Sequence, residues 1–298
     1  MQTETTIAGI NFNSYVMNAS GINDSTLEEL EVIASSGSSA IVMKSCTLEP
    51  REGNKEPRYA RLPLGAIQCM GLPNLGYKKY IEFASKLKEK YNKPIIASVA
   101  GLDAKDYPVL VKAFQESDAD MIEVNVSCPN LADHSIYGYG NWEVEQILKS
   151  ISNFRQKPIG LKLPPYLQGG NSYLVGVMQE YNVSFITCVN SVPNTLVIDA
   201  EKEIPILKPK KGFGALCGSY IKPIALANVF QFYQLLEGGI SIIGVGGIET
   251  GKDAFEFLLC GADAVQIGTC FEKQGSEAFA RINKELEDIS LRYLPALY

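Results

Sequence analysis

The sequence predicts an α/β protein built as a single (β/α)8 TIM barrel over residues 1–298, with long active-site loops. Three observations support this prediction. Short runs rich in valine and isoleucine alternate about eight times with amphipathic stretches. The runs are apolar throughout, which is typical of parallel strands buried on both faces. No linker rich in proline, glycine or serine divides the chain. A doubly wound open sheet is the alternative.

Eight segments are expected to form the barrel strands. In chain order they cover residues 15–19, 39–43, 94–99, 121–126, 158–163, 184–189, 241–245 and 264–267. The stretches between them repeat apolar residues at helical spacing, and several end in glycine, as helix C-termini often do. The helices are expected over residues 26–37, 77–91, 104–117, 142–154, 173–181, 224–239 and 252–261.

Two connections are much longer than the others. Residues 44–76 follow the second expected strand and residues 190–219 follow the sixth, both without helical periodicity. Loops of this length inside a compact domain are usually functional. In a barrel, the loops after the strands form the active end, so the chemistry is expected there.

Composition limits the function classes. Apolar residues make up 46% of the chain, and the net charge is −6 with lysine and arginine dispersed. This charge pattern argues against a nucleic acid or an anionic membrane as partner and favours a small-molecule substrate. No run is long enough to span a membrane, and the N-terminus lacks a signal-peptide pattern, so we expect a cytoplasmic protein.

Cysteine and histidine usage argues against a disulfide scaffold and a metal site. The chain has seven cysteines, without a C-x-x-C pair, and one histidine. Cys128 is the exception by context, because Asn125 and Asn130 flank it, so its thiol is a candidate base or nucleophile. Cys188 and Cys260 lie in apolar segments and are expected to be small buried side chains. His134 is expected in a solvated loop, with a gating role over the thiol as the alternative.

Polar residues gather where the expected strands end. They comprise two lysines, several carboxamides and hydroxyls, and no pair of acids: Asn18, Ser20, Lys44, Ser45, Asn125, Ser127, Asn130, Lys162, Asn190 and Ser191. Asparagine offers a donor and an acceptor together, whereas lysine offers charge. The set therefore predicts a site for a planar, hydrogen-bonding, partly anionic ring, such as a pyrimidine or a flavin. The alternative is that each residue caps a helix or a turn.

Glycines after the last two strands indicate a phosphate site. Gly246 and Gly247 follow the seventh strand, and Gly268 and Thr269 follow the eighth. Barrels commonly hold a phosphate at these two loops, where glycine lets backbone N–H groups approach it. A phosphorylated cofactor or substrate is therefore expected, with tight turns as the alternative.

Motifs over nearly the whole chain resemble one enzyme family. The segments KSCTLEPREGNKEPRY, MGLPNLG, NVSCPN, KLPPY, NSVPNTLVID and GVGGIETGKDAFEFLLCGA occur in this order. They resemble the class 1A dihydroorotate dehydrogenases, FMN-dependent cytosolic barrel enzymes that are typically homodimers. This resemblance implies oxidation of dihydroorotate to orotate in pyrimidine biosynthesis, with fumarate reduced to succinate and no iron–sulfur subunit. Cys128 and the short N-terminus disfavour the membrane class, whose base is serine.

The resemblance also implies roles for individual residues. Cys128 would be the catalytic base. The residues implied for the substrate are Lys44, Gln68, Met70, Gly71, Leu72, Asn125, Asn130, Asn190 and Ser191. Those implied for FMN are Ala19, Ser20, Gly21, Lys44, Ser45, Asn125, Lys162, Gly218, Ser219, Gly246, Gly247, Gly268 and Thr269. Lys162 would lie near the N1 and O2 atoms of the flavin.

Three departures from the family pattern lie near the substrate. Gln68 replaces an asparagine, residues 131–136 lack the usual lysine, prolines and glutamine, and residues 215–219 are altered. The longer carboxamide of Gln68 is expected to orient dihydroorotate less well. These departures leave two alternatives open: a related FMN oxidoreductase acting on another cyclic amide or enone, and a barrel that binds flavin or phosphate without turnover.

Overall fold

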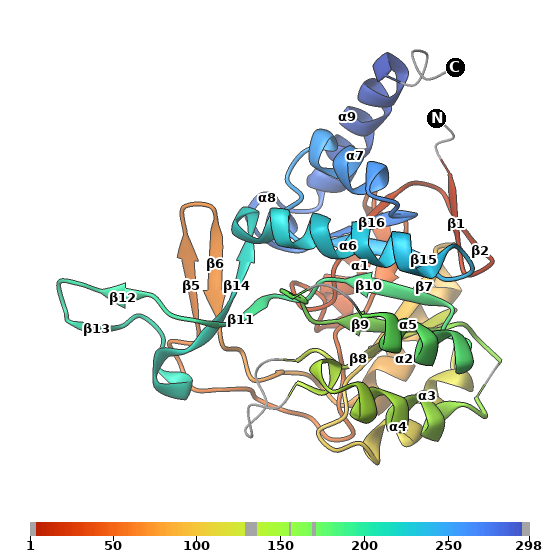
Figure 1. Cartoon of the computed structure of the whole chain (residues 1–298), viewed down its shortest axis with the longest axis horizontal. Helices are drawn as coiled ribbons and strands as arrows, with labels where there is room; N and C mark the ends of the chain where they lie inside the picture. The colour runs from red at the N-terminus through yellow and green to blue at the C-terminus, as the bar shows by residue number, and fades with distance from the viewer. Residues whose placement is uncertain (1–3, 129–135, 155, 169–170, 294–298) are drawn as a thin grey trace.

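The expected strands lie side by side in one parallel sheet, in the order β3-β16-β15-β10-β9-β8-β7-β4. The computed structural model describes residues 4–128, 136–154, 156–168 and 171–293. The strands are β3 (Val16–Asn18), β4 (Ile41–Val42), β7 (Ile95–Val99), β8 (Met121–Asn125), β9 (Ile159–Leu163), β10 (Phe185–Cys188), β15 (Ser241–Val245) and β16 (Ala264–Ile267). Each lies inside a segment predicted from the sequence, so the barrel prediction is confirmed (Figure 1).

A side chain helps to close the barrel between β3 and β4, the two strands at the ends of this order. The Ser39 N–H donates to the carbonyl of Val16 at 2.9 Å. Further up, the carboxamide of Asn18 donates to the Val42 carbonyl at 2.7 Å and accepts from the Val42 N–H at 2.9 Å. The Asn18 carboxamide therefore takes the place of the backbone N–H and C=O groups of a neighbouring strand, because it carries a donor and an acceptor in one group.

The barrel interior is apolar at one end and polar at the other. The apolar end holds Met17, Val42, Ile96, Met121, Phe185, Ile243 and Ala264 in one buried cluster. An N-terminal hairpin of β1 (Thr5–Ile7) and β2 (Ile10–Phe12) adds Ile7 and Phe12 to this cluster and covers that end. Gly160 is required here, because a Cβ would lie 2.5 Å from the Phe185 ring. Toward the carboxyl ends, the inward positions carry polar side chains.

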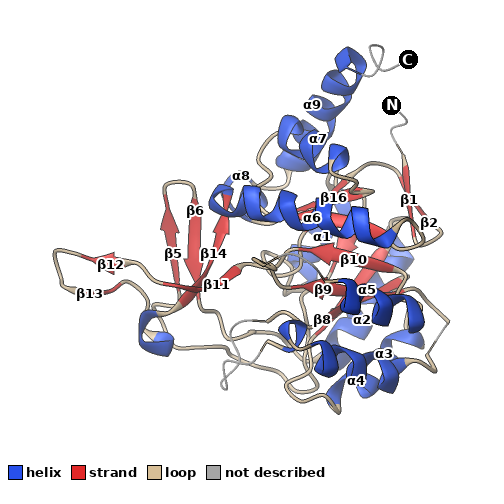
Figure 2. Ribbon diagram, in the orientation of Figure 1, coloured by secondary structure: helices blue, strands red, loops and turns tan. Residues whose placement is uncertain are grey.

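Helices cover the outside of the barrel (Figure 2). They are α1 (Leu27–Ser35), α2 (Tyr77–Lys90), α3 (Asp106–Gln115), α4 (Asn141–Ile151), α5 (Ser172–Glu180), α6 (Lys222–Leu236), α7 (Gly251–Leu259), α8 (Thr269–Gln274) and α9 (Glu277–Tyr293). Short 3-10 turns lie at η1 (Tyr137–Tyr139), η2 (Pro209–Gly212) and η3 (Ser219–Ile221). The helices from α1 to α7 match those expected from the sequence, whereas α8 and α9 were not among the expected elements.

The two long connections form a second, antiparallel sheet. Its strands are β5 (Tyr59–Leu62), β6 (Gly65–Gln68), β11 (Val192–Thr195) and β14 (Gly214–Gly218), in the order β11-β14-β6-β5. Gly65 pairs with Gly218, and a Cβ on Gly65 would lie 2.0 Å from the Cys217 carbonyl oxygen. A separate hairpin of β12 (Ile198–Asp199) and β13 (Ile204–Pro205) projects away from the barrel (Figure 1). Within the described residues, no helix is long and apolar enough to cross a membrane.

Candidate active site

A cavity of about 420 Å³ lies at the carboxyl ends of the barrel strands, beneath the antiparallel sheet. It brings together most of the residues predicted from the sequence: Ala19, Ser20, Gly21, Lys44, Ser45, Gln68, Met70, Leu72, Asn125, Cys128, Lys162, Asn190, Ser191, Gly218, Gly246, Gly247, Gly268 and Thr269. Asn130 and His134 fall outside the described residues. The cavity therefore unites residues from both ends of the chain.

Four predicted residues do not line the cavity: Asn18, Ser127, Gly71 and Ser219. Asn18 is hydrogen-bonded to the Val42 backbone, and the Ser127 hydroxyl is hydrogen-bonded to Asn125 and Asn190. Gly71 has a φ of +76°, and a Cβ there would lie 2.6 Å from the Asn54 side chain, so its hydrogen faces the neighbouring loop. The Gly71 carbonyl accepts from the Arg51 guanidinium at 3.3 Å. The Ser219 N–H donates to the Leu64 carbonyl at 2.8 Å, which ties η3 to the antiparallel sheet. Gly71 and Ser219 shape the wall rather than facing the space inside it.

A row of hydroxyl groups and carboxamides forms one wall. The hydroxyl of Ser45 lies 3.1 Å from that of Ser20 and 2.8 Å from that of Ser98. The Asn125 carboxamide donates to the Ser45 hydroxyl at 3.0 Å, and its oxygen accepts from the N–H and the hydroxyl of Ser127, both at 3.0 Å. These bonds hold Asn125 in one orientation, at a strand end where the sequence predicted a ring-binding amide.

The same wall continues through Ser127 to Asn190 and Gln68. Asn190 donates to the Ser127 hydroxyl at 2.9 Å, and its oxygen accepts from the Ser191 N–H at 2.8 Å. Gln68, at the end of β6, donates to the Ser191 hydroxyl at 3.3 Å and accepts from the Met70 N–H at 3.1 Å. Gln68 therefore bridges two loops that are far apart in the sequence.

A charged network in the barrel interior was not anticipated from the sequence. Glu123 is fully buried, and its carboxylate accepts from the hydroxyls of Ser98 at 3.1 Å and Thr187 at 2.8 Å. The Gln266 amide lies 3.5 Å from the same carboxylate, and its oxygen accepts from the Lys162 ammonium at 3.0 Å. This network fixes the Lys162 charge at the cavity floor. The sequence did contain a signal for this network, because a polar residue interrupts an apolar strand at Glu123 in MIEVN and at Gln266 in AVQI.

Cys128 lies at the edge of the cavity in a mixed environment. Its side chain is 9% exposed and packs with Leu72 and Ala100. Cys46 and Cys188 differ, because both are fully buried and burial raises the pKa of each thiol. The prediction of a small buried side chain is confirmed for Cys188, whereas Cys260 is only partly buried. Cys128 lines the cavity, as do Cys217 and Cys270, whose thiol pKa values are also raised by burial.

The glycine-rich end of the cavity has a backbone that other residues would not adopt easily. Gly246 has a φ of +133° and Gly247 a φ of +75°. A Cβ on Gly247 would lie 2.9 Å from the Gly218 carbonyl and 2.8 Å from the Lys222 Cβ. A Cβ on Gly246 would lie 2.9 Å from the Ala225 Cβ. The loop after β15 can therefore approach the end of β14 and the start of α6 this closely only with glycine. Such a close approach is typical of a cradle of backbone N–H groups that binds phosphate.

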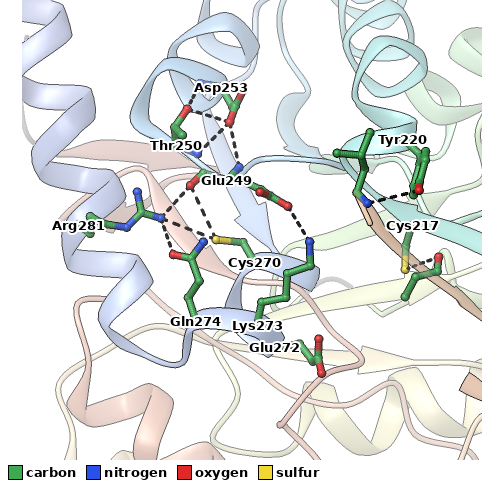
Figure 3. A network of polar contacts seen from close by, with 12 residues as sticks. Cys217, Tyr220, Glu249, Thr250, Asp253, Cys270, Glu272, Lys273, Gln274 and Arg281 are labelled. Atoms are coloured by element: carbon green, nitrogen blue, oxygen red, sulfur yellow. Dashed lines mark hydrogen bonds and ion pairs between the residues drawn. The ribbon is translucent and has the colours of Figure 1, made fainter. Parts of the chain in front are cut away.

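Charged residues surround this end of the cavity (Figure 3). Lys273 pairs with Glu249 at 3.1 Å, and the Arg281 guanidinium donates to the Glu249 carbonyl at 2.8 Å. Glu272 of α8 accepts from the Tyr59 hydroxyl at 3.2 Å and forms an ion pair with Arg61. These contacts fasten the antiparallel sheet to the last barrel unit. Among the described residues, no group of three or more histidine, cysteine or acidic side chains could hold a metal ion.

Comparison with known proteins identifies the family. Residues 2–289 match the family model described as Dihydroorotate dehydrogenase. The chain is 45% identical over 289 residues to "Dihydroorotate dehydrogenase A (fumarate)" of Lactococcus lactis subsp. cremoris (strain MG1363). The aligned region covers 96% of this chain and 93% of the relative. It is 46% identical over 290 residues to the protein of the same name from Lactococcus lactis subsp. lactis (strain IL1403), with the same coverage of 96% and 93%. The chain therefore belongs to the dihydroorotate dehydrogenase family, class 1A.

Proposed function

We propose that this protein oxidises (S)-dihydroorotate to orotate and passes the electrons to fumarate, as a step of pyrimidine biosynthesis in the cytoplasm. The observation that supports this most is the composition of the cavity. It combines two buried lysines and several carboxamides with three thiols, Cys128, Cys217 and Cys270, while its two acids, Glu249 and Glu272, each form an ion pair with a basic side chain. This set suits a planar, anionic, amide-rich ring and a proton abstraction, and it does not suit hydrolysis by paired carboxylates.

The proposed cofactor is FMN, and the residues present fit it. The Gly246–Gly247 backbone, with both residues at positive φ, would hold the phosphate together with Gly268 and Thr269. Lys162, fixed by Gln266, would lie beside the pyrimidine part of the flavin, where a positive charge stabilises the reduced, anionic ring. FMN would supply the hydride acceptor. Mass spectrometry of the released cofactor tests this assignment, and FAD or no flavin would contradict it.

The substrate would occupy the side of the cavity lined by Cys128. Lys44 would pair with the substrate carboxylate, while Asn125 and Asn190 would hydrogen-bond to the ring amides. The Cys128 thiolate would remove the proton from C5 as the hydride leaves C6. Fumarate is also a small carboxylate, so it would use the same subsite after orotate leaves. Ping-pong kinetics, with orotate competing against fumarate, are the expected consequence.

A related oxidoreductase of another cyclic amide is the second candidate. Gln68 favours it, because its side chain lines the cavity and bridges Met70 and Ser191 where the family has asparagine. A panel of dihydropyrimidines and cyclic enones, tested for anaerobic bleaching of the bound flavin, separates the two candidates. Faster bleaching by another ring than by dihydroorotate would favour the second.

The direct test of the proposed function uses the purified holoenzyme without oxygen. Dihydroorotate is expected to bleach the flavin, and fumarate is expected to restore its colour without any added protein. A requirement for an iron–sulfur partner would contradict the class 1A assignment. We also propose a homodimer, because the β12–β13 hairpin projects from the barrel with Ile198 and Ile204 exposed.

Replacing Cys128 tests the mechanism. We expect Cys128→Ala to slow flavin reduction by dihydroorotate by roughly 10²–10⁴-fold, the usual effect of a positioned base. FMN should stay bound, because the glycine loops lie elsewhere in the cavity. Cys128→Ser should retain some activity only at higher pH, since a hydroxyl is a much weaker acid. Stopped-flow measurement of anaerobic flavin reduction gives the rates, and wild-type reduction in the alanine variant would exclude Cys128 as the base.

A further inference from the structure

Asp24, in the loop between β3 and α1, is a buried carboxylate with an unusual hydrogen-bond pattern. Its exposure is 0%, and its Oδ2 accepts from the Gly21 N–H at 2.6 Å. Its Oδ1 is buried and has no hydrogen-bond partner among the described residues. Buried polar atoms normally have a partner, so each exception needs an explanation. Asp24 is not among the residues implied by the motifs, and it does not line the cavity.

Asp24 and Lys44 hold the same residue from opposite sides. The Lys44 ammonium donates to the Gly21 carbonyl at 2.8 Å, while Asp24 accepts from the Gly21 N–H. The Lys44 N–H also donates to the Asp24 carbonyl at 3.3 Å. Lys44 is 7% exposed and lines the cavity, so its charge faces any bound anion. Asp24 therefore places a negative charge near Lys44, outside the cavity, whereas a carboxylate ligand would meet the positive charge of Lys44 from inside the cavity.

Few other ionisable groups act on Asp24. Glu29 lies in the first turn of α1, next to this loop, and its carboxylate accepts from the Ser25 and Thr26 N–H groups at 2.7 Å and 3.1 Å. Tyr80 of α2 donates to the Ser25 carbonyl at 3.2 Å. Burial raises the pKa of the Tyr80 hydroxyl and of the nearby Cys46 thiol, so both stay neutral near neutral pH.

The charge of Asp24 changes close to neutral pH. Burial raises the pKa of Asp24 to about 6, although Lys44 and the Gly21 N–H lower it and Glu29 raises it further. Below this pKa, Asp24 is neutral and the Lys44 charge acts on the cavity without an opposing charge. Above it, the Asp24 carboxylate offsets part of that charge.

We propose that Asp24 is a positioning residue that balances the charge of Lys44, so that its protonation sets how tightly the cavity holds a carboxylate ligand. The proposal rests on the proposed function, in which orotate and fumarate are such ligands. An anion bound at Lys44 disfavours the ionised form of Asp24. By linkage, carboxylate binding takes up a proton on Asp24 and weakens as the pH rises.

The test measures orotate binding to the oxidised holoenzyme through the change in flavin absorbance, without turnover. For the wild type, the Kd is expected to rise about threefold to tenfold between about pH 5 and pH 8, with its midpoint near the Asp24 pKa of about 6. In Asp24→Asn, the amide oxygen can still accept from the Gly21 N–H, but the charge is lost. This variant should bind orotate at the higher pH as tightly as the wild type does at the lower pH.

Asp263 provides a matched control at the opposite end of the barrel. Its carboxylate also accepts from a backbone N–H, that of Ile242 at 2.7 Å, and burial also raises its pKa. Asp263→Asn should leave the pH profile of orotate binding unchanged. Asp24→Ser is a second neutral variant, whose hydroxyl can replace the acceptor for Gly21, and it should give the same flat profile as Asp24→Asn.

Each outcome has a distinct meaning. A pH step in orotate affinity that persists in both neutral Asp24 variants would overturn the role of Asp24 and leave the proposed function intact. Equal loss of affinity at every pH would also overturn it, because it would mean that Asp24 supports only the loop structure. Absence of orotate binding by the wild type at every pH would overturn the proposed function, and this role of Asp24 with it.

Discussion

Individual charged residues in the cavity and next to it balance stability against chemistry. Lys44, Lys162, Glu123 and Asp24 are all buried, and buried charges cost free energy unless they are paired and hydrogen-bonded. Glu123 is hydrogen-bonded by Ser98 and Thr187, whereas one oxygen of Asp24 has no hydrogen-bond partner in the part of the chain that the structure describes. The cost of ionising Asp24 should therefore appear as a pH-dependent loss of stability.

Asp24→Asn should stabilise the fold at about pH 8 by about 1–3 kcal/mol, since the pKa of Asp24 rises from 3.8 to about 6 on folding and each unit is worth about 1.4 kcal/mol. A raised pKa means that the folded state binds the proton more tightly than the unfolded state. This contribution to stability is complete below 3.8 and is lost as the pH rises through about 6. Urea unfolding measures it. A pH-independent gain in the variant would show that ionisation is not the cause.

The bridge formed by Gln68 changes what a substitution there should do. The longer carboxamide was expected to orient dihydroorotate less well, but it spans from Ser191 to the Met70 N–H. Asparagine is one methylene shorter and would keep only one of these hydrogen bonds. Gln68→Asn should therefore raise the KM for dihydroorotate about twofold to tenfold with little change in kcat, the effect of one hydrogen bond. Steady-state kinetics decide, and a lower KM would mean that the bridge does not support binding.

Elements of the active end depend on close approach between loops. The loop after β15 passes against the end of β14 and the start of α6, and only glycine fits there at a positive φ. An ion pair and a hydrogen bond from β5 to α8 hold the antiparallel sheet over the same end. A side chain in the β15 loop should therefore disturb cofactor binding as well as stability.

Gly247 and Gly275 form a matched pair for testing this loop. Both have a φ of +75°, but a Cβ on Gly247 would meet the Lys222 Cβ at 2.8 Å, whereas nothing lies within 4 Å of one on Gly275. Gly275→Ala should cost only the backbone strain, about 1–3 kcal/mol, because a φ of +75° with a ψ of −172° is a conformation that essentially only glycine adopts. Gly247→Ala should cost more and should lower the FMN content of the purified protein. Flavin absorbance per chain and urea unfolding report the two effects, and equal FMN content in both variants would contradict the cradle.

At the scale of the whole molecule, one hairpin projects from the barrel. The β12–β13 hairpin extends away from the core with Ile198 and Ile204 exposed, and Leu196 next to it is exposed as well (Figure 1). Such an isolated two-stranded hairpin is marginally stable in water without packing. A second copy of the chain, covering this apolar surface, would supply that packing.

Ile204→Asp should therefore shift the protein from dimer to monomer in sedimentation velocity experiments, because a charge would be buried at the interface. The control is Leu259→Asp, since Leu259 is equally apolar and exposed but lies on α7, outside the hairpin. The control should remain dimeric. A wild type that sediments as a monomer at all concentrations, or a dimeric Ile204→Asp variant, would contradict this assembly.

The sequence by itself determined the barrel and most of the cavity. Apolar runs with helical stretches between them placed the barrel strands and the helices α1 to α7, because both signals are local and repeat along the chain. The residues at the strand ends, such as Lys44, Asn125 and Lys162, could be read directly, because parallel strands in a barrel bring their carboxyl ends to one face.

Only the tertiary structure decided how the long connections fold and which charges meet. The strands β6 and β14 are short and pair across 151 positions of the chain, as between Ala66 and Cys217, so no local pattern announces them. The network from Glu123 to Lys162 and the unpaired oxygen of Asp24 likewise depend on neighbours from other strands and loops. Periodicity reports which face of an element is buried, but the partner of a buried polar group is set by three-dimensional packing.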